Sequence, residues 1–367
     1  MIERGILYVV DPAANCIRQQ VLTMLKYLNR ARYKPYLVVS EDAYLIEHAR
    51  KLNVDYITNP GISTASKINI GGICRSIEQF VAERKINLIH SHGIQACFVA
   101  ANLAKSLNVA HISTVHLIDD SHKKKGLFSV GTDKILAMAD HLIAVSEVVK
   151  ASIDSISDNI TLIYNGIEAD RFAETLDSEQ LFRELGIEKG SSLIGVITTL
   201  EPGKGTDVFL DAASLLAGLR EDMRFVVVGD GPELEALKKK SFSLGIGKRT
   251  YFLGFRRDVA HILKSLDAVV IPNLSPGLPI ILLEALASSK PVIVTDVPGV
   301  REAVSESEVE FVPVKDPIAI DKAVRKILSQ RMVAGTKAQE GQKLVKDRFS
   351  VQQMMKPTES LYLKLAK

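Results

Sequence analysis

Short apolar runs alternate with longer amphipathic segments along most of the chain. The first series of apolar runs comprises residues 6–10, 36–40, 55–59, 88–92, 111–116, 141–146 and 160–165. The second series comprises residues 192–200, 224–231, 250–255, 268–273, 291–296 and 308–314. Runs that are apolar on both faces predict buried parallel strands, which need crossover connections that are usually helical. The pattern therefore predicts an α/β fold with two doubly wound, Rossmann-like parallel sheets.

A polar stretch at residues 168–190 separates the two series. A chain of 367 residues is too long for one ordinary core, and about two domains are expected at this length. We expect the first domain at residues 1–168 and the second at residues 169–349. Ligands of such folds bind beyond the carboxyl ends of the strands and in clefts between domains, so the functional residues are expected there.

The composition is ordinary for a soluble globular protein, with 47% hydrophobic and 24% charged residues. The net charge of +3 gives no reason to expect a nucleic-acid partner. Cys16, Cys74 and Cys97 show no paired spacing and are interpreted as reduced thiols of a cytoplasmic protein. We expect neither a signal peptide nor a membrane span, because the first apolar run is short and no later run approaches 18 residues.

One short basic run, Lys123–Lys125, precedes Leu127 and Phe128. Basic and apolar side chains in this combination can rest weakly on an anionic membrane surface, here the inner face of the membrane. A solvated surface loop is the alternative interpretation of the same residues.

A strand, a turn and a helix follow one another within residues 268–289. This order directs free backbone N–H groups and the positive end of a helix dipole toward a ligand, which favours an anion such as a diphosphate. Glu284 lies among apolar neighbours in the helix, where its carboxylate can accept hydrogen bonds from two sugar hydroxyls; a surface glutamate on an amphipathic helix is the alternative. The candidate ligand-binding residues of this segment are Gly277, Leu278, Pro279, Ile280 and Glu284.

Three further strand ends of the second series carry candidate residues. Lys204 lies in a Pro-Gly-Lys-Gly loop and supplies a mobile positive charge, although the glycine spacing is not that of a Walker A loop. Gly231 lies in a tight strand-to-helix turn, and Gly254 permits close approach of a ligand to the backbone beside Phe255 and Arg256. Solvated charges and ordinary turns are the alternatives.

The first series contributes histidines at two strand ends. His90 and His92 stand two residues apart on one strand, and His116 ends the next. No further ligands stand at suitable positions, so we expect no metal site. His92 and His116 are interpreted as polar site residues, and His90 as either a site residue or a satisfied core histidine. The first strand-to-helix turn lacks G-x-G-x-x-G, which argues against a dinucleotide oxidoreductase.

Together these segments resemble the retaining glycosyltransferases of family 4, which have the GT-B fold. The resemblance covers nearly the whole chain and is strongest over residues 190–304. The segments that carry it are VSE (145–147), IYNGIE (163–168), EPGKG (201–205), VVVGDGPE (226–233), YFLGF (251–255) and GLPIILLEALASSKPVIVTDVPGVREAV (277–304). The closing segment, from about residue 350 to residue 367, resembles the final helix of the family, which returns to the N-terminal domain.

The resemblance implies that the second domain binds a nucleoside diphosphate sugar and the first binds the acceptor, with no metal or other cofactor. Lys204 and the amides of Leu278 and Ile280 would contact the diphosphate, and Glu284 would bind the ribose. The backbone at Gly254–Arg256 would contact the base, and His116 would lie beside the transferred sugar. Further candidates are Asn15, His92, Thr199 and Gly231.

Two departures from the family pattern affect the donor site. Pro276 stands where the family has the first of two glutamates, and Thr199 replaces an arginine that accompanies the loop lysine. A charge-assisted hydrogen bond is worth about 1.5–3 kcal/mol, so its loss weakens donor binding about tenfold or more. Arg256 or Arg257 is a conjectural replacement.

The sequence supports two hypotheses. The first is a retaining glycosyltransferase that moves a sugar, with UDP as the expected nucleotide, to a glycan or lipid-linked acceptor in cell-surface polysaccharide synthesis. The second, motivated by Pro276 and Thr199, is a degenerate nucleotide-sugar-binding or scaffold subunit of a glycan-assembly complex.

Overall fold

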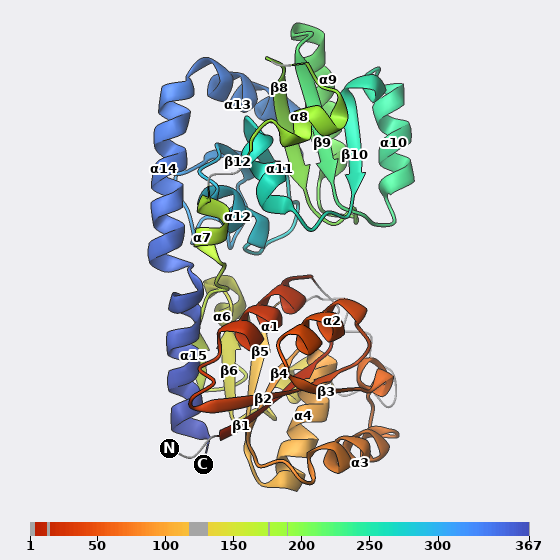
Figure 1. Ribbon diagram of the computed structural model, residues 1–367, viewed down its shortest axis with the longest axis vertical. Coiled ribbons are helices and arrows are strands. Elements are labelled where there is room, and N and C mark those ends of the chain that lie inside the picture. The colour runs from red at the N-terminus through yellow and green to blue at the C-terminus, as the bar shows by residue number, and fades with distance from the viewer. Residues whose placement is uncertain (1–3, 13–14, 117–130, 175–176, 189, 367) are drawn as a thin grey trace. The chain divides into compact units, whose positions relative to one another are not determined.

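The computed structural model describes residues 4–12, 15–116, 131–174, 177–188 and 190–366 (Figure 1). The chain divides into two compact units. Unit 1 comprises Met1–Gly166 together with Val351–Lys367, and unit 2 comprises Ile167–Ser350. Each unit is built on one parallel sheet, which confirms the predicted fold class.

Unit 1 contains a seven-stranded sheet in the order β3-β2-β1-β4-β5-β6-β7. Its strands are β1 (Arg4–Val10), β2 (Tyr33–Val39), β3 (Asp55–Thr58), β4 (Ile86–His92), β5 (Ala110–Val115), β6 (His141–Ala144) and β7 (Ile160–Leu162). Its helices are α1 (Asn15–Tyr27), α2 (Ala43–Lys51), the 3-10 helix η1 (Pro60–Thr64), α3 (Ile70–Val81), α4 (Ile94–Leu107), α5 (Thr132–Leu136), α6 (Glu147–Ile153) and α15 (Val351–Leu365).

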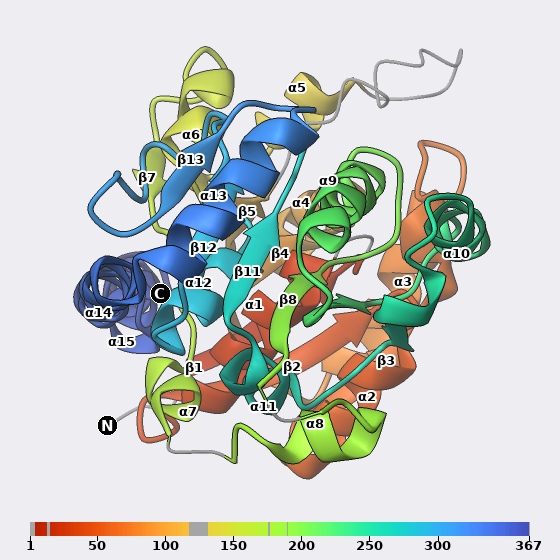
Figure 2. The ribbon, with the colours of Figure 1, turned by 90° about the horizontal axis from the view of Figure 1, so that it is seen from above.

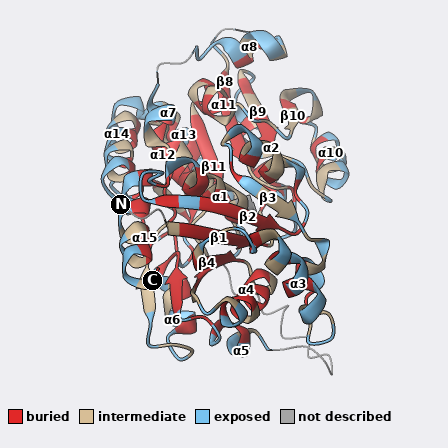
Figure 3. Cartoon of the chain, turned by 60° about the horizontal axis from the view of Figure 1, so that its bottom comes forward, coloured by how far each residue is buried: buried red, intermediate tan, exposed pale blue. Residues whose placement is uncertain are grey.

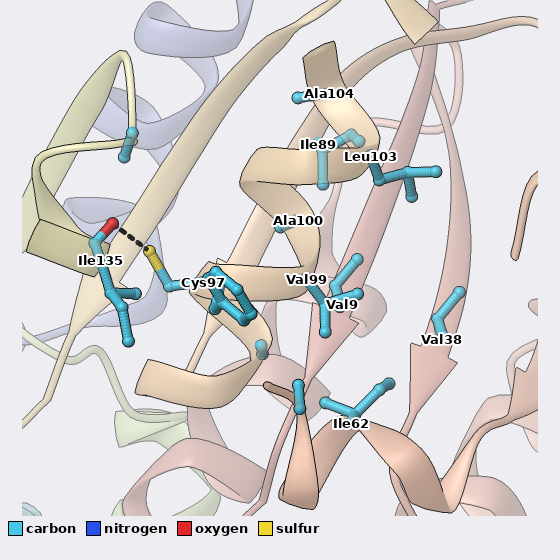
Figure 4. Close-up of a cluster of buried hydrophobic side chains, with 14 of the residues drawn as sticks. Val9, Val38, Ile62, Ile89, Cys97, Val99, Ala100, Leu103, Ala104 and Ile135 are labelled. Carbon is cyan, nitrogen blue, oxygen red and sulfur yellow. Dashed lines mark hydrogen bonds between the residues drawn. The ribbon is translucent and has the colours of Figure 1, made fainter. Parts of the chain in front are cut away.

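Both faces of this sheet are covered, which explains why its central strands are largely apolar. On β1, Leu7 and Val9 belong to the cluster beneath α3 and α4, whereas Ile6, Tyr8 and Val10 belong to the cluster beneath α1, α2 and α15. Figure 3 shows β1, β2 and β4 mostly buried. Figure 4 shows α4 packed on the first of these faces, where the Cys97 thiol donates to the carbonyl oxygen of Ile135 over 3.5 Å.

The C-terminal helix α15 completes unit 1 and lies beside its strands in Figure 1. Its Tyr362 is fully buried, and the Tyr362 hydroxyl hydrogen-bonds with the Tyr8 hydroxyl at 3.1 Å and with His90 Nδ1 at 2.5 Å. The helix is therefore held by a buried polar contact as well as by apolar packing.

Unit 2 contains a six-stranded sheet in the order β10-β9-β8-β11-β12-β13. Its strands are β8 (Ser192–Ile197), β9 (Met223–Val228), β10 (Thr250–Gly254), β11 (Ala268–Ile271), β12 (Val292–Thr295) and β13 (Glu310–Val312). Its helices are α7 (Ala169–Ala173), α8 (Gln180–Leu185), α9 (Thr206–Leu219), α10 (Leu234–Ser243), the 3-10 helix η3 (Gly247–Arg249), α11 (Val259–Ser265), α12 (Ile280–Ala287), α13 (Pro317–Ser329) and α14 (Arg331–Arg348).

One face of this second sheet packs against α9 and α13, which lie on the same side of it in Figure 2. Phe209 of α9 and Phe225 of β9 meet edge to face in this layer, with ring centroids 6.3 Å apart. The strands are apolar on both faces here too, and their carboxyl ends point to one edge because all neighbours are parallel. The loops at that edge position the candidate residues.

Three details differ from the sequence-based prediction. The polar stretch 168–190 contains two short helices, α7 and α8. Helix α1 ends at Tyr27 instead of near Arg32, because the amides of Arg32 and Tyr33 donate to the carbonyl oxygen of Asn29 in a turn that leads into β2. Strand β5 ends at Val115, so His116 follows the strand instead of ending it.

Within the described part of the chain, no helix has the length and apolar character needed to cross a bilayer. The basic run Lys123–Lys125, with Leu127 and Phe128, lies outside the described residues.

Candidate functional site

The loops at the carboxyl edge of the unit 2 sheet are joined to one another by backbone hydrogen bonds. The amide of Leu274, after β11, donates to the carbonyl oxygen of Gly203 in the β8–α9 loop over 2.9 Å. The amide of Gly277 donates to the carbonyl oxygen of Pro298, after β12, also over 2.9 Å. These bonds bring the Lys204 loop and the start of α12 to the same edge of the sheet.

The Lys204 loop depends on the glycine that follows the lysine. Gly205 has a φ of +71°, and a Cβ atom there would lie 2.0 Å from the carbonyl oxygen of Pro272. Only glycine permits both this conformation and this approach. The Lys204 amide donates to the carbonyl oxygen of Glu201 over 3.2 Å, and its side chain is partly exposed. The sequence therefore presents the lysine directly before the first turn of α9.

Helix α12 begins without a side-chain cap. Pro279 is its N-cap residue, with extended backbone angles, and Ile280 is the first helical residue. Among the residues that the structure describes, the amides of Leu278 and Ile280 have no hydrogen-bond acceptor. Unpaired amides at a helix N-terminus form a natural site for an anion. Pro276, which precedes this turn, is exposed.

Glu284 lies on the fifth position of α12 and is half-buried. Burial raises the pKa of its carboxyl to about 7, and the nearby positive charge of Arg171 partly opposes this rise. No hydrogen bond to the Glu284 carboxylate is found within the described ranges. A desolvated carboxylate without donors is an acceptor for which ligand hydroxyls can supply the missing hydrogen bonds.

Arg171 is a neighbour of Glu284 that no motif in the sequence indicates. Arg171 belongs to α7, and α7 packs against α12 within unit 2 (Figure 1). More than a hundred residues separate the two side chains, and α7 lies in a stretch that reads as polar linker. No local pattern in the sequence reports this contact, because it arises only when the helices pack.

Thr199 and Gly231 belong to neighbouring turns of the same edge. The Thr199 hydroxyl donates to the Glu201 carboxylate over 3.2 Å. A Cβ atom on Gly231 would lie 2.4 Å from the carbonyl oxygen of Leu200, so this glycine packs directly on the β8–α9 loop. Both residues support the shape of that loop.

The turn after β10 presents Gly254, Phe255 and Arg256. Gly254 accepts a hydrogen bond from the Gly229 amide over 2.9 Å, and the Phe255 side chain is 64% exposed. The Arg256 guanidinium forms ion pairs with Glu184 at 2.5 Å and Asp258 at 2.7 Å. The guanidinium therefore already has two carboxylate partners, and the replacement of the family arginine by Arg256 or Arg257 stays a conjecture.

In unit 1, two histidines pair at the carboxyl edge of the sheet. His92 is the last residue of β4, and its Nδ1 lies 3.3 Å from Nε2 of His116, which follows β5. Burial lowers the pKa of the His116 imidazole to about 3 and places that of His92 well below its ordinary value, so both rings are neutral at pH 7. The outer nitrogens, His92 Nε2 and His116 Nδ1, are buried and have no hydrogen-bond partner among the residues that the structure describes.

His90 does not share this arrangement. Its ring is fully buried, with Nδ1 bonded to the Tyr362 hydroxyl and Nε2 to the Thr114 hydroxyl at 2.8 Å. Of the two interpretations offered by the sequence, the satisfied core histidine is the one found. Among the described residues, no group of three or more His, Cys, Asp and Glu side chains is placed to hold a metal ion. Asn15 begins α1, directly after residues 13–14, which lie outside the described ranges.

Comparison with known families matches two models to successive parts of the chain. The model "Glycosyltransferase Family 4" matches residues 17–171, and "Glycosyl transferases group 1" matches residues 177–343. An uncharacterised glycosyltransferase of Methanocaldococcus jannaschii is 28% identical over 295 residues, which is 76% of this chain and 75% of that protein. The Escherichia coli UDP-Gal:alpha-D-GlcNAc-diphosphoundecaprenol alpha-1,3-galactosyltransferase is 29% identical over 244 residues, 61% of each chain.

Solved structures share the fold over nearly the full length. HepE of Anabaena, in complex with UDP, superposes with a TM-score of 0.81 at 20% identity, covering 97% of this chain and 99% of HepE. A glycosyltransferase of Rickettsia africae superposes with a TM-score of 0.85 at 18% identity, and the coverage is 100% of both chains. At these identities the likeness establishes the GT-B fold, in which each of two domains is Rossmann-like.

Proposed function

Because this chain belongs to glycosyltransferase family 4, we propose that it takes a sugar from a UDP-linked donor and delivers it, with retention of configuration, to a glycan or lipid-linked acceptor. HepE was solved with UDP bound, and the E. coli relative is named for a UDP-sugar donor and a lipid-linked acceptor. These relatives motivate the choice of nucleotide and acceptor class. We assign the donor to residues 169–349 and the acceptor to residues 1–168 with the C-terminal segment.

The donor assignment rests on two features of α12, the Glu284 carboxylate and the free amides at the start of the helix. Within the described part of the chain, the carboxylate receives no hydrogen bond, and the amides of Leu278 and Ile280 have no acceptor. A nucleoside diphosphate supplies both needs, since the ribose carries two hydroxyl donors and the diphosphate carries anionic oxygens. In this proposal Gly277 and Pro279 shape the turn, and the backbone at Gly254–Arg256 contacts the base.

Catalysis in this proposal is mainly electrostatic. Negative charge develops on the diphosphate as it leaves the sugar, and groups already aimed at that charge lower the barrier. In this proposal Lys204 and the α12 amides, whose loops are joined at one edge of the sheet, stabilise that charge. His116 lies beside the transferred sugar, Asn15 and His92 belong to the acceptor side, and Thr199 and Gly231 hold the lysine loop.

The biological setting that fits this reaction is assembly of a cell-surface polysaccharide. A lipid-linked acceptor would bring the protein to the inner membrane face from the cytoplasm, as a peripheral partner. The basic run Lys123–Lys125 is the sequence feature that motivates a weak anionic membrane contact.

The first test is a thermal-shift titration of the intact protein with UDP, GDP and ADP and their common sugar derivatives. A ligand at a hundredfold excess over its Kd stabilises the native state by about 2.7 kcal/mol. We expect the UDP series to raise the melting temperature, and Glu284→Ala and Lys204→Ala each to weaken binding about tenfold or more. The matched control is Lys238→Ala, which removes an exposed lysine paired with Glu235 at 2.9 Å.

The outcomes separate the hypotheses. Transfer of the sugar to a lipid-linked acceptor, with retained anomeric configuration in the product by NMR, supports the enzyme. Binding of UDP-sugar without transfer, alone or with candidate partner transferases, supports the scaffold subunit that Pro276 and Thr199 motivate. No shift with any nucleotide at millimolar concentration contradicts the donor site itself.

A further inference from the structure

Arg171 connects two parts of the candidate donor site within unit 2. It belongs to α7, which packs against α12, the helix that carries Glu284 (Figure 1). Its Nη2 donates a hydrogen bond to the carbonyl oxygen of Arg257 over 3.4 Å, in the turn after β10. Its guanidinium carbon lies 5.7 Å from the centroid of the Phe172 ring, and Phe172 is buried. The guanidinium is therefore held at the turn after β10 by a helix that packs on α12.

Arg171 is also the charged group that acts on Glu284. Strand β12 carries no charge, and α14 contacts α12 through Gly341 and Gln342, which are uncharged. Helix α7 contains Asp170 and Arg171. Burial raises the pKa of the Glu284 carboxyl to about 7, and among the described residues the positive charge of Arg171 opposes this rise. Without that charge, the carboxyl should stay protonated to a higher pH.

The charge of Arg171 is available for this effect. Within the part of the chain that the structure describes, Arg171 forms no ion pair, whereas Arg256 in the nearby turn is paired with Glu184 and Asp258. The Arg171 side chain is exposed and Glu284 is half-buried, so solvent weakens their attraction but does not remove it.

The protonation state of Glu284 decides which hydrogen bonds it can accept. An ionised carboxylate accepts at both oxygens, whereas a protonated carboxyl carries a donor on one of them. Hydrogen bonds to an ionised acceptor are also stronger than those to a neutral one. Two ribose hydroxyls that both donate to Glu284 therefore need the ionised form.

We propose that Arg171 is a positioning residue of the donor site, which links the turn after β10 to α12 and keeps Glu284 ionised to accept the ribose hydroxyls of the nucleotide. This inference rests on the proposed function and deepens it, because it adds a residue that acts on the nucleotide through Glu284. Arg171 itself contacts no part of the nucleotide in this proposal.

The coupling between the two side chains can be measured without nucleotide. Carbon-13 NMR of protein labelled at the glutamate carboxyl groups follows the titration of Glu284, and Glu284→Gln identifies its signal. We expect a midpoint near pH 7 in the wild type and a higher midpoint in Arg171→Met. Arg171→Lys, which restores the charge, should return the midpoint toward the wild-type value. An unchanged midpoint in Arg171→Met overturns the proposal.

The pH dependence of nucleotide binding then tests the role in the donor site. The probe is UDP-glucose, whose diphosphate is esterified at both ends and does not titrate between pH 6 and pH 8. We expect Arg171→Met to weaken its binding about threefold to tenfold at pH 7, more at pH 6 and less at pH 8, because Glu284 ionises as the pH rises. An equal loss at all three pH values indicates a merely structural role and overturns the proposal.

A second background shows whether Arg171 acts through Glu284. In Glu284→Gln no carboxylate remains for the arginine to act on, so adding Arg171→Met should change the affinity for UDP-glucose less than about twofold. A further loss as large as in the wild-type background would mean that Arg171 binds the nucleotide directly, which overturns the positioning role.

Folding and function are controlled separately. Thermal melts establish that the variants fold, and the matched control is Arg183→Met, which removes an exposed arginine of α8 paired with Asp177 and Glu179 and should bind as the wild type. If the wild type binds UDP-glucose and only the expected effects of Arg171→Met fail, the inference is wrong and the donor site stands. If the wild type does not bind UDP-glucose, the proposed donor is contradicted together with the positioning role, whatever midpoint NMR gives for Glu284.

Discussion

The carboxyl edges of the two sheets carry polar groups of opposite chemistry, yet burial affects both in the same way. In unit 1 the groups are imidazoles at strand ends, and burial lowers the pKa of His116 to about 3. In unit 2 the group is a half-buried carboxyl on a helix, and its loss of hydration raises the pKa of Glu284 to about 7. Each environment favours the neutral form, because a charged group loses hydration when it is buried.

The difference lies in the direction of the pH response. A buried base binds fewer protons in the folded state than in the unfolded state, so the folded state becomes less stable as the pH falls. A buried acid binds more protons in the folded state than in the unfolded state, so the folded state becomes less stable as the pH rises. These groups therefore lower the stability of unit 1 as the pH falls and that of unit 2 as the pH rises, although each unit is built on a parallel sheet.

The largest expected effect is the acid sensitivity of unit 1. Burial places the pKa values of His90, His111 and His116 near 3, so protons bind preferentially to the unfolded chain below about pH 6.5. Each histidine should cost unit 1 about 2 kcal/mol between pH 7 and pH 5. Urea unfolding can be followed by the reactivity of Cys74 and Cys97, which are buried in unit 1, with a disulfide reagent that works at acid pH.

We expect these thiols to react at a lower urea concentration at pH 5 than at pH 7. The variant His111→Gln keeps an amide near the Ser91 hydroxyl. It should reduce the loss of unfolding free energy between pH 7 and pH 5 by the contribution of one histidine. Equal urea midpoints at both pH values would show that burial of these rings does not control the stability of unit 1.

The next effect concerns the helix that closes unit 1. Tyr362 is fully buried, so Tyr362→Ala should lower the free energy of unfolding by about 3–5 kcal/mol through the cavity alone. Tyr362→Phe keeps the ring but leaves the Tyr8 hydroxyl and His90 Nδ1 without this partner, at a cost of about 1–3 kcal/mol. The same thiol assay measures both changes. Similar costs for the two variants would mean that the hydroxyl contacts, and not the ring packing, hold α15.

The smallest effect tests the opposite sign in unit 2. The pKa of Glu284 near 7, against an ordinary value of 4.5, should cost the folded state about 3 kcal/mol above pH 7, and the cost should disappear below pH 4.5. Glu284→Gln removes this dependence, so the variant should gain stability over the wild type between pH 5 and pH 8. Circular dichroism follows the urea unfolding of unit 2 as the transition in which the thiols of unit 1 do not become reactive. If the urea midpoints of Glu284→Gln and the wild type agree at pH 5 and at pH 8, the raised pKa of Glu284 is refuted.

Most of the fold follows from local patterns, for a physical reason. Strands covered on both faces must be apolar along their length, and this signal survives in a single sequence. The predicted runs match strands of both sheets, from Ile6 in β1 to Val312 in β13. Helices α7 and α8 were not predicted, because they are short and polar and depend on packing within unit 2 for their stability.

The candidate site likewise has features that local sequence indicates and features that only packing creates. The positions of Lys204 and Glu284 in a loop and a helix are local facts that the sequence indicates. The environment of Glu284 requires α7 to pack on α12, and the His92–His116 contact requires β4 and β5 to pair with His92 opposite Thr114. Register and packing between distant segments have no local signal, so the contact between the two histidines emerges only from the structure.

The return of α15 to unit 1 also sets an order of events during synthesis. Every residue of unit 2 is translated before Val351, so the six strands of its sheet can pair while unit 1 still lacks its last helix. Until Tyr362 emerges from the ribosome, the nascent chain holds His90 and Tyr8 without their final hydroxyl partner. A message that stops before the codons of α15 would therefore damage the part of the protein that was made first.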